Sequence, residues 1–330
     1  MKKRVQLGAA IVLGALVVGI AFLLFRPISI RNLTSTPTPA TSYADAVERI
    51  ETLRVQQASL ALNPLCQLQF MTHGQKTGRA IVFVHGYTNC PQQFHELGQQ
   101  FFELGYNVLI APAPRHGLTD RMTTEQAQLT AEELATYADA VVDVAQGLGE
   151  HVTMAGISMG GIVTAWAAQQ RSDVDLAVLI SPAFGLQMIP ALATEPAVNA
   201  FLALPNFYQW ADSTLKEANG PDYTYPRRST RALAQTLRLS LAIQALAAED
   251  PPAGRSILVI TNASDSSVDN ALTAETVATW LAWGVDVTTY EFPADLQLAH
   301  DLIDPSQQSQ PVVYPRLVEL IAKATERSRQ

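Results

Sequence analysis

The chain has 330 residues, of which 48% are hydrophobic and 16% are charged, values typical of a globular protein with one large domain and some additional segments. Its formal net charge is −8, and the first 26 residues carry four basic and no acidic side chains, so the remainder carries about −12. A surface with this much negative charge repels phosphate backbones. Nucleic acid is therefore excluded as an expected partner.

The N-terminal segment has the pattern of a membrane anchor. Basic residues from Lys2 to Arg4 precede an uncharged run from Val5 to Phe25, about the 20 residues that a helix needs to cross a bilayer. A cleavable signal peptide would have a shorter apolar core and a small-x-small site, whereas this run ends in Leu-Phe-Arg-Pro. We therefore predict an uncleaved signal-anchor at residues 1–26, a single transmembrane helix with its N-terminus in the cytoplasm and the following domain outside.

Residues 27–42 are predicted to be a linker. The stretch from Thr34 to Ser42 is of low complexity and contains prolines, which favour an extended backbone. The next stretch, Tyr43 to Leu62, has apolar residues at nearly helical spacing and predicts a helix that packs on the domain. We place the main domain at residues 43–330.

Strand-like and helix-like segments alternate through this domain. Short apolar runs rich in β-branched residues predict strands at 80–85, 107–111, 152–157, 176–181, 256–261 and 285–292. Helical patterns occur at 91–104, 130–147, 159–171, 271–283 and 315–326. The second of these helices opens with a capping box at Thr130 and Glu133. This alternation predicts an α/β fold with an open, doubly wound, mostly parallel sheet that is covered on both faces.

A long interval separates the strand that ends at Ser181 from the strand that begins at Ser256. It holds more than seventy residues, too many for a simple crossover, and it is rich in aromatic residues, proline and leucine. We predict an inserted, mainly helical cap at about residues 183–252 over the carboxyl edge of the sheet, with Trp210 or nearby aromatics close to the nucleophile. The alternative is a set of scaffold helices packed beside the sheet.

The segment around Ser158 has the G-x-S-x-G pattern of a nucleophile elbow. It follows an apolar strand and precedes a helix of small residues. Such a serine has to lie on a strained turn above the sheet, and Gly156 and Gly160 remove side chains that would collide there. We predict Ser158 as the nucleophile. An ordinary strand-to-helix turn is the alternative for this pentapeptide when it is considered alone.

His300 and Asp265 are predicted to complete a Ser-Asp-His triad. In a fold with the order serine, acid, histidine, His300 is the histidine that follows the last strand. The acid should follow the preceding strand, where Asp265 and Asp269 are the candidates. We favour Asp265 because it is nearer the strand end, whereas Asp269 suits the start of the next helix. We expect Ser158 Oγ within about 3.5 Å of one ring nitrogen of His300, with Asp265 at the other.

Attack on an acyl group also requires two backbone N–H groups that stabilise the developing negative charge. Met159 follows the nucleophile and is expected to supply one of them. The loop from His85 to Thr88 should supply the other, through the amide of Tyr87. His85 is expected to shape this loop rather than to transfer protons.

These motifs resemble the α/β-hydrolase superfamily. Five of them occur in the family's order: H-G-Y-T-N-C-P-Q-Q-F (His85 to Phe94), R-H-G-L-T-D (Arg115 to Asp120), G-I-S-M-G-G (Gly156 to Gly161), S-D-S-S-V-D (Ser264 to Asp269) and A-H-D-L-I-D-P (Ala299 to Pro305). The chain is most similar to the carboxylesterase and monoacylglycerol-lipase-like branch, also labelled serine aminopeptidase-like, from about Leu65 to the C-terminus. The resemblance implies the same triad and the same oxyanion donors. The departures from the family pattern are Cys90, the membrane anchor and the long cap.

Cys66 and Cys90 are the two cysteines of the chain. Because the anchor would place the domain in a compartment where disulfides persist, we predict a disulfide between them. Such a bond would pin the loop that carries Tyr87. The alternative is two separate buried thiols.

We expect a membrane-anchored, extracytoplasmic serine hydrolase that cleaves small-molecule or lipid-like carboxylic esters through an acyl-enzyme. The alternatives are an amide or peptide hydrolase of the same fold and an inactive binding module, against which the intact triad argues. Neither a His, Cys and Asp cluster with metal-ligand spacing nor a phosphate-binding glycine pattern occurs in the sequence. We therefore predict no metal and no cofactor.

Overall fold

The computed structural model describes residues 2–30, 32–211 and 220–329, with the side chains of residues 2–5 and 7–10 left out. Within these ranges, seven strands form one sheet in the order β1-β3-β2-β4-β5-β8-β9. The strands are β1 (Gln69–Met71), β2 (Thr77–Val84), β3 (Asn107–Ile110), β4 (Gly149–Ile157), β5 (Leu176–Ile180), β8 (Ser256–Asn262) and β9 (Asp286–Phe292). β1 is antiparallel to β3 and the other pairings are parallel, which confirms the predicted mostly parallel sheet.

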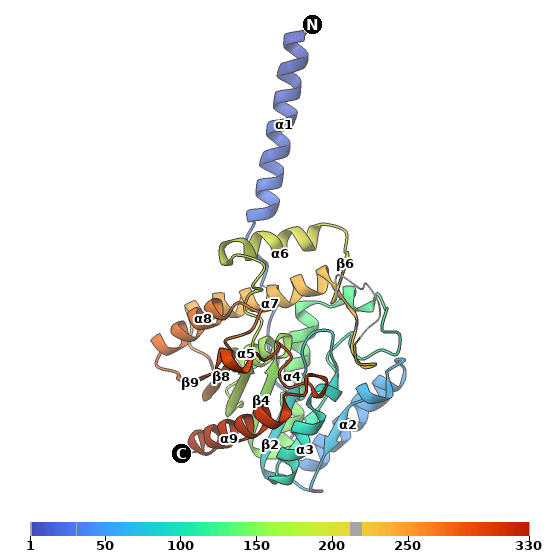
Figure 1. The fold of residues 1–330 in the computed structure, drawn as a ribbon, viewed down its shortest axis with the longest axis vertical. Helices are drawn as coiled ribbons and strands as arrows, with labels where there is room; N and C mark the ends of the chain where they lie inside the picture. Colours follow the sequence, from blue (N-terminus) through green and yellow to red (C-terminus); the bar gives the residue numbers. More distant parts are fainter. Residues whose placement is uncertain (1, 31, 212–219, 330) are drawn as a thin grey trace.

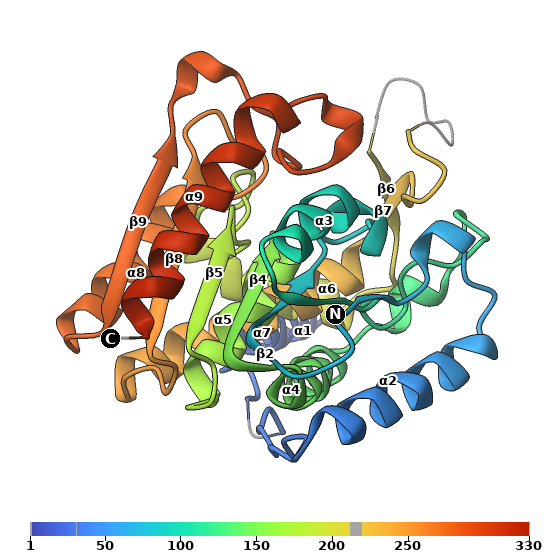
Figure 2. The ribbon, with the colours of Figure 1, turned by 90° about the horizontal axis from the view of Figure 1, so that it is seen from below.

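Helices cover both faces of the sheet (Figure 2). They are α2 (Tyr43–Ala58), α3 (His95–Glu103), α4 (Ala131–Leu148), α5 (Met159–Gln170), α8 (Asn270–Ala282) and α9 (Gln310–Ser328). Side chains of β2 alternate between two apolar layers: Ala80, Val82 and Val84 pack with α4 and α5, whereas Ile81 and Phe83 pack with α3 and α9. A doubly wound sheet of this kind presents the carboxyl ends of its parallel strands at one edge, where ligands bind.

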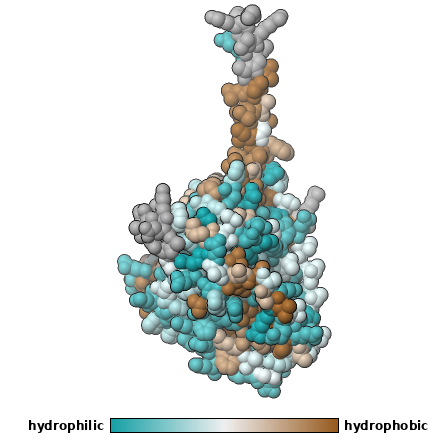
Figure 3. All heavy atoms as spheres, turned by 90° about the vertical axis from the view of Figure 1, so that its right-hand side faces the viewer, coloured by the Kyte–Doolittle hydropathy of each residue, from teal (hydrophilic) through white to brown (hydrophobic). Residues whose placement is uncertain are grey.

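The helix α1 (Lys2–Phe25) projects from the rest of the molecule (Figure 1). Most of its described side chains are apolar and exposed, among them Ile11, Val18 and Phe22. Figure 3 shows the projecting helix as a mostly brown column. Among the described residues, however, no helix is both long and apolar enough to cross a membrane. The transmembrane helix predicted at residues 1–26 is therefore not shown by this part of the chain, and some of its side chains lie outside the described residues.

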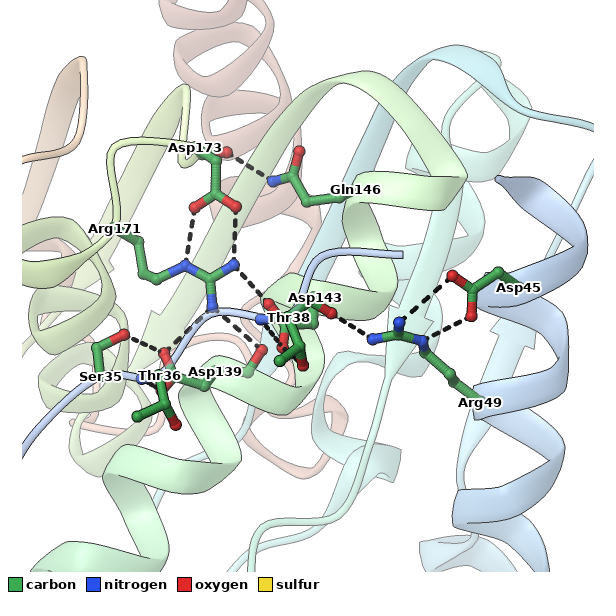
Figure 4. Close-up of polar contacts among 10 residues, drawn as sticks. All are labelled: Ser35, Thr36, Thr38, Asp45, Arg49, Asp139, Asp143, Gln146, Arg171 and Asp173. Atoms are coloured by element: carbon green, nitrogen blue, oxygen red, sulfur yellow. Dashed lines mark hydrogen bonds and ion pairs between the residues drawn. The ribbon is translucent and has the colours of Figure 1, made fainter. Parts of the chain in front are cut away.

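The predicted linker lies against α4 (Figure 4). The amides of Thr36 and Thr38 donate hydrogen bonds to the carboxylates of Asp139 and Asp143, at 2.7 and 2.9 Å. The same carboxylates form ion pairs with the buried guanidinium of Arg171, at 3.2 and 2.6 Å. The segment is thus bound to the domain by polar contacts with residues about one hundred positions away, which its composition does not reveal.

The interval between β5 and β8 contains two helices and a short hairpin. The helices are α6 (Thr194–Ala203) and α7 (Thr230–Glu249), and the hairpin pairs β6 (Tyr208–Trp210) with β7 (Arg227–Ser229). α7 packs on α5 and α4, and α6 packs on α7 and on the end of α1 (Figure 1). Residues 212–219 of the predicted cap lie outside the described residues. The rest of the cap lies over the end of the sheet where the site is built.

Candidate active site

Ser158 lies at the tip of a sharp turn between β4 and α5. Its backbone has φ 57° and ψ −116°, a strained conformation for a residue with a side chain. A Cβ on Gly156 would lie 2.2 Å from the carbonyl oxygen of Gly160, and a Cβ on Gly160 would lie 2.1 Å from that of Val84. Both positions therefore require glycine. The turn places Ser158 at the wall of a cavity of about 470 Å³.

His300 and Asp265 lie on the loops that follow β9 and β8. Nδ1 of His300 is 2.7 Å from Oδ2 of Asp265. The other carboxylate oxygen of Asp265 accepts hydrogen bonds from the amides of Ser267 and Val268, at 2.8 and 3.2 Å. Because Nδ1 faces the carboxylate, Nε2 is the ring nitrogen that remains for a proton donor in the cavity.

Opposing effects set the pKa values of this pair. Burial raises the pKa of Asp265, but the hydrogen bond from His300 and the charge of its imidazolium outweigh burial and bring the pKa below its usual value. Burial lowers the pKa of His300, but the hydrogen bond to Asp265 and the charge of Asp301 outweigh it and bring the pKa above its usual value. The surroundings therefore favour the protonated imidazolium form of His300.

Ser158 and His300 line the same cavity. Among the described residues, no hydrogen bond joins the Ser158 hydroxyl to a ring nitrogen of His300, so the contact within about 3.5 Å stays a prediction. Catalytic hydrogen bonds often tighten only in the complex with substrate. The structure therefore relates Ser158 and His300 by placing both in the wall of one cavity.

Asp269, the alternative acid, has a different task. Its Oδ1 accepts hydrogen bonds from the amides of Ala271 and Leu272, at 2.9 and 3.3 Å, and caps the N-terminus of α8. Asp265, rather than Asp269, is the carboxylate that contacts His300.

The loop after β2 is braced by His85. Nε2 of His85 accepts a hydrogen bond from the amide of Ala113 at 2.9 Å, so Nδ1 carries the proton and donates to the carbonyl of Gly86 at 2.8 Å. Burial, followed by the charge of His116, lowers the pKa of His85 to about 3. The ring is therefore neutral and shapes the loop.

The two candidate oxyanion donors meet at the cavity. Tyr87 and Met159 line it together with Ser158. Met159 begins α5, where a backbone N–H has no partner within the helix. The hydroxyl of Tyr87 accepts a hydrogen bond from the amide of Ser229 at 2.8 Å, which links the loop to the cap hairpin.

Cys66 and Cys90 are joined by a disulfide, with their Cα atoms 5.2 Å apart. Both residues are fully buried. Cys90 follows the loop after β2, and the adjacent amide of Asn89 donates to the carbonyl of Gly86 at 3.2 Å. The disulfide therefore connects this loop to the segment that precedes β1.

The cap supplies one wall of the cavity. Its aliphatic lining residues are Leu186, Met188, Leu233 and Leu237. Trp210 is not a lining residue. Side chains alternate along a strand, and because Gln209 and Ala211 face the cavity, Trp210 between them faces away. The expectation of an aromatic wall from the cap is therefore wrong for the described residues, and the apolar character of the wall comes from aliphatic side chains.

Sequence reasoning missed three residues of this region. The side chain of Gln93 is buried and connects the amide of Gly86 to the carboxylate of Asp301, at 2.8 and 3.2 Å. Asp304 is buried on the loop that carries His300, and Arg228 lines the cavity from β7. Gln93 and Asp304 lie inside segments already singled out by their motifs. No local pattern marks Arg228, whose position depends on the pairing of β6 with β7.

Several known proteins are similar to this chain in sequence or in fold. Residues 75–279 match the family described as serine aminopeptidase, S33. A thermostable monoacylglycerol lipase from Bacillus sp. (strain H-257) is 27% identical over 169 residues, which make up 48% of this chain and 60% of that protein. A metagenome-derived lipolytic enzyme from a study of LipS and LipT has a TM-score of 0.59 at 19% identity, covering 79% of this chain and 99% of its own. The Paleococcus ferrophilus monoacylglycerol lipase has a TM-score of 0.57 at 14% identity, covering 78% and 98%.

The likeness to the solved structures is one of fold, the α/β-hydrolase fold. The chain spans about three fifths of the curated relative that it matches. The family match covers more than half of the chain, including the elbow and the loop of Asp265, and it ends before His300. The chain therefore belongs to the serine aminopeptidase S33 family of α/β-hydrolases.

Proposed function

We propose that this protein is a serine hydrolase that cleaves carboxylic esters through an acyl-enzyme. Ser158 is the nucleophile, His300 is the general base and Asp265 orients the imidazole. The observation that carries the proposal is the contact of 2.7 Å between His300 Nδ1 and Asp265, at a cavity whose wall includes the strained Ser158.

The reaction proceeds in two halves. In the first, Ser158 Oγ attacks the ester carbonyl carbon while Nε2 of His300 takes the hydroxyl proton, and the amides of Tyr87 and Met159 stabilise the oxyanion. The tetrahedral intermediate collapses, the bond to the alcohol oxygen breaks, and the imidazolium returns its proton to the leaving alcohol. In the second half, water attacks the acyl-enzyme with His300 again as base, which releases the carboxylic acid and restores Ser158.

The cavity wall favours an ester with an apolar part. Four aliphatic side chains of the cap line it, and hydrophobic walls with a few placed polar groups are typical of small-molecule sites. The curated relative is named a monoacylglycerol lipase. We infer that the substrate is a small, lipid-like ester.

The location that we propose is the membrane, with the catalytic domain on the extracytoplasmic side. The basic residues that precede an uncharged run support this orientation, and the exposed apolar surface of α1 supports the anchor. Asn199 of α6 donates to the carbonyls of Leu24 and Arg26, at 3.0 and 2.8 Å, which holds the end of α1 against the cap. We expect the full chain to remain in membranes washed with alkaline carbonate, with its domain open to external protease. Release by the wash would overturn the anchor.

The activity is tested with p-nitrophenyl esters of increasing acyl length and a matched p-nitroanilide, using the full chain in detergent. We expect ester hydrolysis that falls at least about a thousandfold in Ser158→Ala, and a fluorophosphonate label that reacts with the parent chain alone. Equal labelling of both proteins would remove Ser158 as the nucleophile. Faster cleavage of the anilide than of the matched ester would indicate an amide hydrolase rather than an esterase.

A further inference from the structure

Arg228 places a cationic side chain in the wall of the active-site cavity. It lies on β7, is half-buried, and lines the cavity together with Ser158, His300 and Asp301. Its Nε is fully buried and has no hydrogen-bond partner among the described residues. The Nε–H of the guanidinium is thus removed from water without a described protein acceptor.

The Nε atoms of Arg227 and Arg231 are likewise buried without a hydrogen-bond partner among the described residues, but the guanidinium of each of these arginines donates a hydrogen bond through another nitrogen. Arg227 donates a hydrogen bond to the carbonyl of Met122 and stacks over the ring of Tyr208. Arg238 forms an ion pair with Glu132 at 2.7 Å. Within the described chain, Arg228 forms neither a hydrogen bond through its guanidinium nor an ion pair, which sets it apart from these neighbours.

Strand pairing explains why Arg228 faces the cavity. It is the partner of Gln209 across the β6–β7 hairpin, and both residues line the cavity. Adjacent residues on a strand point to opposite sides, so Arg227 is directed away from it. Arg227 therefore makes contacts on the outer side of the hairpin, whereas Arg228 lines the cavity.

Asp301, an acidic residue of the same cavity wall, is already engaged. Asp301 accepts a hydrogen bond from Gln93 at 3.2 Å, and its charge acts on the adjacent His300. Arg228 lines the same cavity as His300 and Tyr87, and its positive charge acts to lower the pKa of both side chains. An anionic group on a bound ester would thus find an available cation in the wall of the cavity that Ser158 also lines.

A charged group that is partly removed from water without a partner is costly, and an arriving anion would offset that cost. The planar guanidinium matches the geometry of carboxylates and phosphates. We propose that Arg228 binds a carboxylate or phosphate group of the substrate, so that the preferred ester has an apolar chain and an anionic group. This inference rests on the proposed ester hydrolysis and names the class of ester.

The test compares esters that differ in one anionic group, with the full chain in neutral detergent. The first pair is 4-nitrophenyl butyrate and mono(4-nitrophenyl) succinate, which places the charge on the acyl side. The second pair is 1-octanoylglycerol and 1-octanoylglycerol 3-phosphate, which places it on the alcohol side. The quantity measured is kcat/KM for each ester, after the active sites are counted with a fluorophosphonate.

We expect Arg228→Gln to lower kcat/KM for the anionic member of at least one pair by roughly ten- to a hundredfold, and to change the neutral member by less than about threefold. Arg228→Lys keeps the charge but not the planar fork, and should retain an intermediate preference. Arg231→Gln is the matched control. It removes the same charge from the start of α7, outside the cavity wall, and should leave both members unchanged.

A preference in the first pair alone would assign the anionic group to the acyl side, and in the second alone to the alcohol side. An equal loss for both members of each pair, or no loss, would overturn the role of Arg228 while Ser158-dependent hydrolysis still stands. If no ester is cleaved in a Ser158-dependent way, the proposed function fails and this inference fails with it. Arg228→Lys keeps the test decisive should Arg228→Gln fold poorly.

Discussion

The side-chain amide of Asn89 donates a hydrogen bond to Oδ2 of Asp304 at 2.7 Å, and so joins the loop after β2 to the loop that carries His300. The other oxygen of Asp304 accepts from the hydroxyl of Tyr223 at 2.8 Å and from the amide of Ser306 at 2.9 Å. Asp304 is buried. One carboxylate therefore connects the candidate oxyanion loop, the histidine loop and the cap.

Asp304→Asn is expected to lower kcat by about tenfold or more on a neutral ester, with a smaller change in KM. The carboxamide has one acceptor oxygen, so its NH₂ would face a donor on one side and loosen the connection between the loops. Asp295→Asn, on an exposed part of the same region, is the matched control and should have no effect. Rates are referred to active sites titrated with a fluorophosphonate. If kcat per titrated site is unchanged in the Asp304 variant, Asp304 does not position the catalytic loops and contributes to stability alone.

Asp265→Asn should lower kcat by roughly 10⁴-fold, because a carboxamide does not stabilise the imidazolium and favours the wrong tautomer of His300. Asp269→Asn is the matched control. Asparagine caps a helix about as well as aspartate, so α8 and the activity should both be preserved. A large loss in the Asp269 variant together with a small loss in the Asp265 variant would reverse the assignment of the acid.

Much of this arrangement could be read from local sequence patterns. The elbow at Ser158 and the parallel strands are specified by adjacent residues, because the glycine spacing and the apolar runs are physical requirements of the turn and of a covered sheet. β1 was not predicted, since three residues on a sheet edge carry almost no pattern. β1 is recognised as a strand only by its antiparallel pairing with β3 in the folded structure.

Long-range contacts account for the features that were missed. The orientation of Trp210 and Arg228 is set by the register between two strands that are separated by more than a dozen residues. The contact of Asn89 with Asp304 spans 215 positions. Neither relationship leaves a periodic signature, so a carboxylate at position 304 reads in the sequence as an ordinary polar loop residue.

Arg228→Gln is expected to move the acidic limb of the kcat/KM profile to higher pH. His300 must be neutral to act as base, so activity rises as pH passes its pKa. The charge of Arg228 opposes the imidazolium and lowers this pKa, so removing it raises the pKa further above the usual value. The measurement uses a neutral ester, and Arg231→Gln should leave the profile in place. A limb that stays in place or moves to lower pH in the Arg228 variant would contradict the expected sign.

Removal of the disulfide in the double variant Cys66→Ala, Cys90→Ala should lower the free energy of unfolding by about 3.5 kcal/mol, the chain-entropy value for a loop closed across 24 residues. Urea unfolding measures the change. Reduction of the parent protein by dithiothreitol should shift its midpoint in the same direction, while the double variant should be insensitive to the reductant. If reductant destabilises both proteins equally, its effect does not come from this bond.

Arg171→Leu should destabilise the domain strongly. Arg171 is almost fully buried, and its guanidinium nitrogens lie within 3.2 Å of carboxylate oxygens of Asp139, Asp143 and Asp173. Figure 4 shows these three carboxylates around the guanidinium. Removing the guanidinium leaves buried carboxylates without their cation, a change that costs about 3–5 kcal/mol.

Arg54→Leu is the control for this last variant, because Arg54 forms an exposed ion pair with Glu51 on α2 and should contribute less than about 1 kcal/mol. The carboxylates of Asp139 and Asp143 also accept the amides of Thr36 and Thr38. We therefore expect the segment before α2 to lose protection in hydrogen exchange in the Arg171 variant. Equal urea midpoints for the two leucine variants would show that the buried cluster adds no more to stability than a surface ion pair.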